Sequence, residues 1–205
     1  MGLGTSTKKI FVNTFKGSLR VKAQANDPDA ISRTNKEGNV VWEQKHGYVS
    51  GHITGIEVTD HKKFGKQLEI SMHDDGNEFV LSVSALSGYA FAFYNRMENI
   101  NFDQIVKFEM WGPYTGNDGK QRYFLAPIQN GELVSKKYGK DQIPAWELVT
   151  IDNEERFDKT KAFKFFMKKL EAVIKQLGQF GNTAKDVKAE ATAPLDELED
   201  DDLPF

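Results

Sequence analysis

HGYVSGHITGIEVTDHKKFGKQLEISMHDDGNEFVLSVS, residues 46–84, decides the fold because it reads as three β-strands joined by two short turns. Apolar and polar residues alternate over 67–73 and again over 79–83, the two-residue period of a strand with one buried face. A longer strand is predicted over 46–58. Phe64-Gly65-Lys66 and Asp74-Asp75-Gly76-Asn77 supply the turn residues between them. The stretch therefore predicts an antiparallel meander.

The residues that follow extend this pattern in a recognisable order. An Ala-, Phe- and Tyr-rich segment without proline predicts a helix over 86–97, and its rings at 89, 91, 93 and 94 are expected in the core. Strands are predicted over 104–111 and 122–128, with a loop over 112–119. Three strands, a helix and two strands is the β-β-β-α-β-β order of an OB-fold, a small five-stranded barrel. In the first strand the apolar face switches near Gly55, as a strand that bends between two halves of a barrel would require.

The predicted organisation is a mainly β protein with flanking segments. Residues 1–45 form an N-terminal extension with short strands over 10–15 and 40–43, and residues 46–150 form the OB-fold core with an added strand over 132–136. An amphipathic helix is predicted over 151–180, capped by Asp152 or Asn153 and ended by Gly178. This helix either packs on the barrel or forms a dimer or partner surface. Residues 181–205 are predicted to be a disordered acidic tail.

Charge is divided unevenly along the 205 residues, whose formal net charge is −3. Residues 186–205 hold eight acidic residues and one basic residue, while residues 1–185 hold 26 basic and 22 acidic residues and carry a net +4. A mildly basic body with an acidic tail often binds a polyanion through the body. The chain has no cysteine and no apolar run near the ~20 residues of a membrane helix, so we expect a cytoplasmic protein without membrane contact.

The last six residues are Asp200-Asp201-Asp202-Leu203-Pro204-Phe205. A terminal ring can enter an apolar pocket of a partner, its α-carboxylate can pair with a cation beside that pocket, and the Asp run can meet a basic rim. The alternative is a solubilising acidic tail.

This tip resembles the Asp-Asp-Asp-Ile/Leu-Pro-Phe tip of single-stranded DNA-binding proteins, and the chain as a whole resembles the phage type of that family. The resemblance implies sequence-independent binding and protection of single-stranded DNA during phage replication, recombination and repair in the bacterial host cytoplasm. It also implies that the tip recruits a polymerase, a helicase or primase, or a nuclease. The linker is short, so a monomer or dimer is expected rather than a tetramer.

Candidate contacts to nucleic acid are cations and aromatic residues, because single strands are held by phosphate neutralisation and base stacking. The loop after the first core strand offers Lys62, Lys63, Phe64 and Lys66, and the first strand offers Tyr48 and His52. The loop after the fourth strand offers Trp111, Tyr114, Lys120, Arg122 and Tyr123. Trp42, Lys136 and Lys137 complete the candidates. Each has a structural alternative: Trp111 or Tyr123 covers a barrel end, and the lysines are merely solvated. Glu69 and Glu78 count against the interface, because alternation places them on its face.

No catalytic motif, cofactor or metal site is predicted, because the chain lacks a P-loop, a nucleophile elbow and an H-E-x-x-H helix. Two other functions stay open: a strand-annealing or general DNA-binding protein that accepts duplex, and an OB-fold adaptor that binds protein only. The tethered acidic tail is also expected to compete with DNA for a basic cleft.

Overall fold

The computed structural model describes residues 9–35, 37–116, 119, 121–151 and 154–180. Its centre is the predicted meander of β5 (Tyr48–His61), β6 (Gly65–Asp74) and β7 (Asn77–Ser84). The register pairs Val58 with Leu68 and Met72 with Phe79. Asp75 and Gly76 both have positive φ, 42° and 78°, as a tight two-residue hairpin turn requires. The three strands are confirmed, except that His46 belongs to the preceding strand.

The predicted switch of the apolar face near Gly55 is confirmed as a shift of register. The register of β5 against β6 shifts between Ile53 and Gly55, so that one extra residue is accommodated on β5. The shift allows Ile53 and Ile56, three positions apart, both to be buried. β5 therefore pairs with β6 over its later part and with β8 over its first part.

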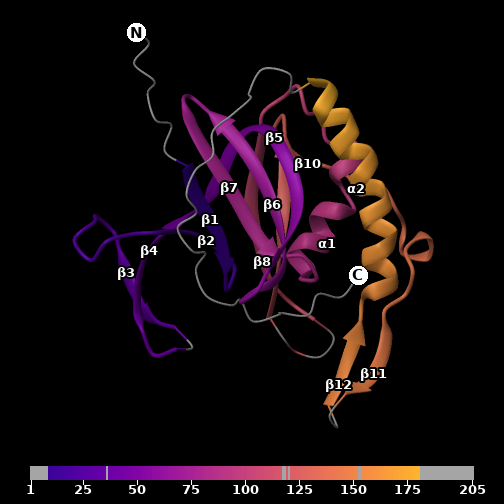
Figure 1. The fold of residues 1–205 in the computed structure, drawn as a ribbon, viewed down its shortest axis with the longest axis horizontal. Coiled ribbons are helices and arrows are strands. Elements are labelled where there is room, and N and C mark those ends of the chain that lie inside the picture. Colours follow the sequence, from indigo (N-terminus) through magenta and orange to yellow (C-terminus); the bar gives the residue numbers. More distant parts are fainter. Residues whose placement is uncertain (1–8, 36, 117–118, 120, 152–153, 181–205) are drawn as a thin grey trace.

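All but two of the strands join one open sheet, and this corrects the prediction of a closed barrel. Its order is β10-β9-β8-β5-β6-β7-β1-β2-β4-β3 (Figure 1). Its remaining members are β8 (Val106–Thr115), β9 (Gln121–Gln129), β10 (Glu132–Leu133), β1 (Lys9–Phe15), β2 (Ser18–Lys22), β3 (Ile31–Thr34) and β4 (Val40–His46). A five-stranded barrel would close by pairing β7 with β9. Instead β7 pairs in parallel with β1, and within the described residues the sheet remains open.

The N-terminal strands therefore extend the core sheet, and the β3–β4 hairpin projects from the body (Figure 1). A buried charge cluster lies at its base. Arg20 Nη1 lies 2.6 Å from Glu43 Oε2, and Arg33 Nη2 lies 2.9 Å from Glu43 Oε1. Both guanidinium groups also lie over the Phe15 ring, at 4.5 Å and 4.7 Å from its centroid. These contacts tie β3 and β4 to the β1–β2 hairpin.

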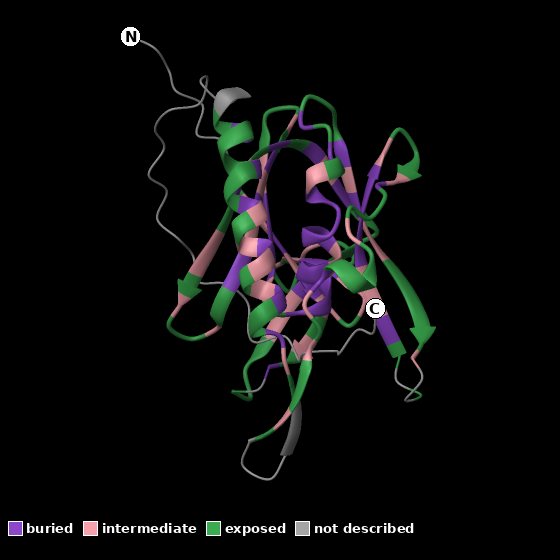
Figure 2. Cartoon of the chain, turned by 90° about the vertical axis from the view of Figure 1, so that its right-hand side faces the viewer, coloured by how far each residue is buried: buried purple, intermediate pink, exposed green. Residues whose placement is uncertain are grey.

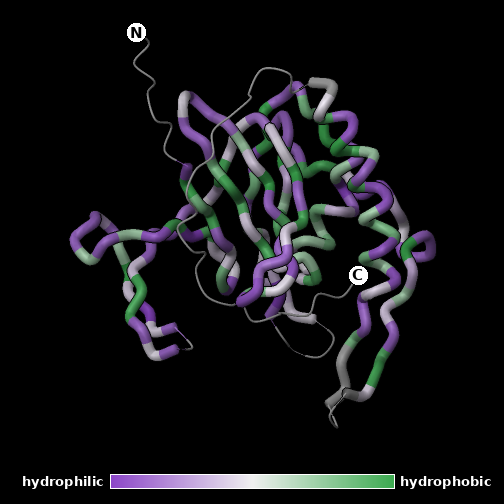
Figure 3. The backbone as a smooth tube through the Cα atoms, viewed as in Figure 1, coloured by the Kyte–Doolittle hydropathy of each residue, from purple (hydrophilic) through white to green (hydrophobic). Residues whose placement is uncertain are grey.

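The predicted helix over 86–97 is confirmed in shorter form as α1 (Gly88–Tyr94), followed by the 3-10 turn η1 (Met97–Asn99). The Ser87 side chain caps α1 by accepting a hydrogen bond from the Ala90 amide. Its aromatic rings are buried in the core, as the sequence predicted. In Figure 3 the hydrophobic stretches lie on the central strands and along the C-terminal helix that packs beside them.

The C-terminal helix begins later than predicted. It is α2 (Thr160–Phe180), and a separate hairpin of β11 (Glu147–Ile151) and β12 (Glu154–Asp158) precedes it after the short turn η2 (Lys140–Gln142). Because β12 pairs with β11, residues 154–158 are extended, and the Asp158 carboxylate accepts from the Thr160 amide in place of the predicted cap. Gly178 lies inside the helix and does not end it.

One face of α2 is buried against the core. Its buried residues are Ala162, Phe166, Leu170, Val173 and Leu177, and in Figure 2 buried segments alternate with exposed segments along the helix. The Phe166 ring lies 5.8 Å from that of Tyr94 on α1. The helix therefore packs on the body, the first of the two alternatives.

Candidate nucleic-acid interface

Three aromatic rings meet on the β8–β9 hairpin. Trp111 is opposite Phe124 in the register, and their ring centroids are 5.7 Å apart. Tyr114 also reaches Phe124, at 6.3 Å. Residues three apart on a regular strand point to opposite faces, but the register shifts between Trp111 and Tyr114 and allows both rings to contact the same neighbour. Trp111 remains 39% exposed and Tyr114 37% exposed, so part of each ring faces solvent.

Two arginines lie beside these rings, and Lys136 lies close enough to Arg96 for their charges to interact. The Arg96 guanidinium lies 5.3 Å from the centroid of the Phe124 ring, and it is held by hydrogen bonds to the carbonyls of Ala92 and Val134. Burial raises the pKa of Tyr114, while the charges of Arg122 and Arg96 act in the opposite direction. Burial and the charge of Arg96 together lower the pKa of Lys136. Arg96 and Arg122 are buried and supply a fixed positive field, whereas the exposed Lys136 can reach a ligand. We call Trp111, Tyr114, Phe124, Arg96, Arg122 and Lys136 the β8–β9 cluster.

A chain of contacts leads from this cluster to the start of β5. The Trp111 indole Nε1 donates to Glu109 Oε2 at 3.1 Å, and Lys107 Nζ lies 2.6 Å from Glu109 Oε1. The hydrogen bond from Lys107, followed by that from Trp111, lowers the pKa of Glu109, so the carboxylate stays charged and orients the indole. Lys107 Nζ in turn lies 5.6 Å from the centroid of Tyr48, which is 58% exposed. Tyr48 and Trp111 are thus joined through two charged residues on one face.

Two lysines at the loop between β5 and β6 form ion pairs with residues outside the β8–β9 cluster. Lys62, Lys63 and Lys66 are exposed, and Phe64 is half-buried. Lys63 forms an ion pair with Glu37, beside the β3–β4 turn, and Lys66 pairs with Asp60. This loop is therefore tied to acidic neighbours rather than to the aromatic rings of β8 and β9.

The remaining sequence candidates are distributed over other surfaces. Tyr123 is half-buried against the β1–β2 turn, where a Cβ added to Gly17 would come within 2.2 Å of its ring. Trp42 is half-buried on β4 opposite Ser32, His52 is exposed on β5, and Lys137 is exposed beside Tyr138. Glu69 is half-buried with its carboxylate 3.2 Å from His61 Nε2, and Glu78 is half-buried opposite Lys9. Lys120 and the tip Asp200–Phe205 lie outside the described residues.

The structure therefore brings together Trp111, Tyr114 and Arg122, places Lys136 near Arg96, and adds two residues, Phe124 and Arg96, that the sequence did not single out. Phe124 lies in the predicted strand 122–128, but no local pattern distinguishes it from a core residue. Arg96 lies at the end of the predicted helix, where a cation is ordinary. One sequence pattern could have identified Lys107 and Glu109 as part of this surface. They alternate with Val106 and Phe108, and this places them on the same face of the strand as Trp111.

No protein-family model, curated protein or solved structure matches this chain. None of the helices in the described part of the chain is long and apolar enough to cross a membrane. Across residues 9–180, within the ranges given above, no three His, Asp or Glu side chains gather in an arrangement that could hold a metal ion.

Proposed function

We propose that this protein binds single-stranded DNA with little sequence preference through the β8–β9 cluster. The observation that carries the proposal is the meeting of three rings on the β8–β9 hairpin, with Arg122 on β9 and Arg96, packed over Phe124, beside them. Bases of any sequence can stack on aromatic side chains, and cations beside the rings can neutralise phosphates. The contacts that hold Trp111 involve its indole nitrogen and an edge-type packing with Phe124, an arrangement compatible with stacking by a base.

The proposal includes two finer points. The elements β5-β6-β7-α1-β8-β9 follow the order of an OB-fold, and we propose that the open sheet is a variant of that fold in which β1 occupies the edge of β7. We further propose that the tip Asp200–Phe205 recruits replication or repair proteins while the body holds DNA, because an acidic segment ending in Leu-Pro-Phe suits capture by a basic, apolar pocket.

The direct test is a titration of intrinsic tryptophan fluorescence with an oligo-dT strand, repeated at several salt concentrations and with duplex DNA. Binding should quench the emission, favour the single strand, and weaken steeply as salt rises. Equal affinity for duplex would instead indicate a general DNA-binding or strand-annealing protein. Absence of binding at low salt, also after deletion of residues 186–205, would contradict DNA binding and leave a protein adaptor.

A further inference from the structure

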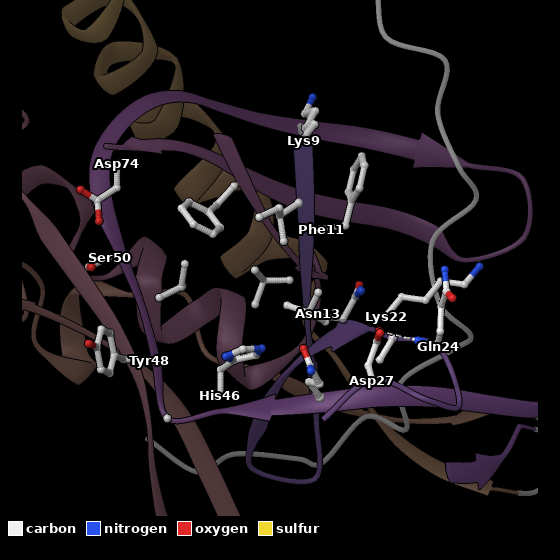
Figure 4. A pocket seen from close by; sticks show the side chains of 18 residues that line it. Lys9, Phe11, Asn13, Lys22, Gln24, Asp27, His46, Tyr48, Ser50 and Asp74 are labelled. Atoms are coloured by element: carbon white, nitrogen blue, oxygen red, sulfur yellow. Dashed lines mark hydrogen bonds between the residues drawn. The ribbon is translucent and has the colours of Figure 1, made fainter. Parts of the chain in front are cut away.

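A groove of about 990 Å³ lies where the N-terminal strands meet the start of β5. Figure 4 shows Tyr48 and Asp74 on one side of it and Lys22, Gln24 and Asp27 on the other, with β1 crossing between them. The volume is at the upper end of the ~300–1,000 Å³ of pockets that enclose small organic ligands. We call this feature the N-terminal groove.

The chemistry of the groove suits an uncharged, flat ligand group. Lys9, Phe11 and Asn13 lie two residues apart on β1 and therefore share one face of the strand. Phe11, Tyr48 and Phe79 all line the groove, but Phe79 is opposite Ile10 in the register of β1 and β7, so its ring lies on the other face of β1 from Phe11. The amide of Asn13 can both donate and accept hydrogen bonds, as the edge of a nucleobase also does.

The charges of the groove nearly cancel. Its charged lining consists of Lys9 and Lys22 against Asp27 and Asp74, together with the titratable His46. A phosphate chain running through the interior would meet both carboxylates, whereas a base would not be repelled. Lys9 and Lys22 are exposed, so their ammonium groups can contact phosphates outside the groove while bases occupy its interior.

The N-terminal groove is continuous with the β8–β9 cluster through Tyr48. Tyr48 lines the groove, and it is opposite Glu109 in the register of β5 and β8. Trp111 lies two residues further along β8, about 7 Å at the rise of an antiparallel strand. The chain Tyr48–Lys107–Glu109–Trp111 described above therefore leads directly from one surface to the other.

We propose that the N-terminal groove binds unstacked bases of the same DNA strand that stacks on the β8–β9 cluster, with phosphates at Lys9 and Lys22. The inference rests on the proposed function, which concerns the β8–β9 cluster alone. It assigns a second part of the DNA path to the N-terminal groove. Of the residues that line this groove, only Tyr48 is a candidate contact predicted from the sequence. It also makes the affinity depend on the length of the strand.

The test compares Lys9→Gln/Lys22→Gln with the wild-type chain over a series of oligo-dT lengths and salt concentrations. The matched control is Lys168→Gln/Lys175→Gln, which removes the same charge from exposed positions on α2. For long strands the groove variant should lower the slope of log affinity against log salt by about 1.4, since each phosphate contact on a single strand contributes ~0.7. The shortest strands that bind should show no change, and the control should behave like the wild type at every length.

A second measurement locates the bases directly. Long strands carrying photoreactive bromouracil should crosslink to peptides containing residues 9–13 or 44–50 as well as to those of β8 and β9, and Asn13→Ala should reduce the former yield. Crosslinks confined to β8 and β9, together with equal salt slopes for the groove variant and the control, would contradict base binding in the N-terminal groove and leave the proposed function intact. Failure of the wild type to bind strands of any length would overturn both.

Discussion

Replacement of Trp111 by alanine isolates the stacking contribution of the β8–β9 cluster. Stacking of a base on an aromatic side chain contributes ~1–3 kcal/mol by alanine substitution. Trp111 is 39% exposed and partly covered by Phe124, so we expect one stacked base and the lower half of that range. A loss of about 1.4 kcal/mol corresponds to a roughly tenfold weaker affinity for single-stranded DNA.

The same substitution should leave the salt dependence unchanged, because it removes no charge. It should have a small effect on folding, since the ring pair with Phe124 contributes ~0.5–1.5 kcal/mol beyond its burial. Trp111→Phe should retain most of the affinity, because it keeps a ring while removing the indole donor to Glu109.

The assay is fluorescence anisotropy of a labelled oligo-dT strand at fixed salt, with thermal denaturation of each variant beside it. Phe157→Ala is the matched control, because Phe157 is an exposed ring (49%) on β12, outside the proposed path. Wild-type affinity in Trp111→Ala, or equal losses in Trp111→Ala and Phe157→Ala, would refute the reasoning that places a base on Trp111.

Three further predictions concern charge, stability and pH. Lys136→Gln should lower the salt slope of single-strand affinity by about 0.7, and Lys175→Gln should not; equal slopes in both would remove Lys136 from the interface. Glu43→Gln should destabilise the protein by about 3 kcal/mol in urea denaturation, because it leaves two arginines without their buried carboxylate, and an unchanged midpoint would contradict this. Burial and a hydrogen bond to Glu98 raise the pKa of Tyr138 to about 12, from ~10 in the unfolded chain. The contribution of the neutral Tyr138 to the free energy of unfolding should therefore be complete below pH ~10 and should decline as the pH rises to 12. The difference in free energy of unfolding between the wild type and Tyr138→Phe should fall over that pH range. A difference that stays constant would contradict this role of Tyr138.

Several features of the fold could be predicted from the sequence because they depend on local rules. The alternation over 67–73 and 79–83 and the Asp75-Gly76 turn specify β6 and β7, since a two-residue hairpin turn favours residues that accept positive φ. The apolar switch near Gly55 predicted the shift in β5, because one extra residue in a strand moves the apolar positions that follow it to the other parity. The rings of α1 were predicted as core from composition alone, and they are buried.

Other features of the fold were predicted wrongly or not predicted at all, because they depend on contacts between residues far apart in the sequence. The parallel pairing of β1 with β7 joins segments about seventy positions apart and leaves the sheet open, and no period in either strand records the partner. Residues 154–158 carry acids that suit a helix start, yet cross-strand pairing with β11 makes them extended.

The candidate site shows the same division. Sequence by itself determined the residue types: aromatic and basic residues over 111–123, a mildly basic body, and an acidic tail ending in Leu-Pro-Phe. The loop predicted over 112–119 was wrong for 112–115, because pairing with β9 extends β8 to Thr115. Only the tertiary structure decided which of these residues meet. A register shift brought Trp111 and Tyr114 to Phe124, and the packing of α1 on β9 placed Arg96 beside the same ring. The physical reason is that alternation and turn chemistry act over a few residues, whereas a binding surface is assembled from side chains whose proximity is set by the packing of the whole sheet.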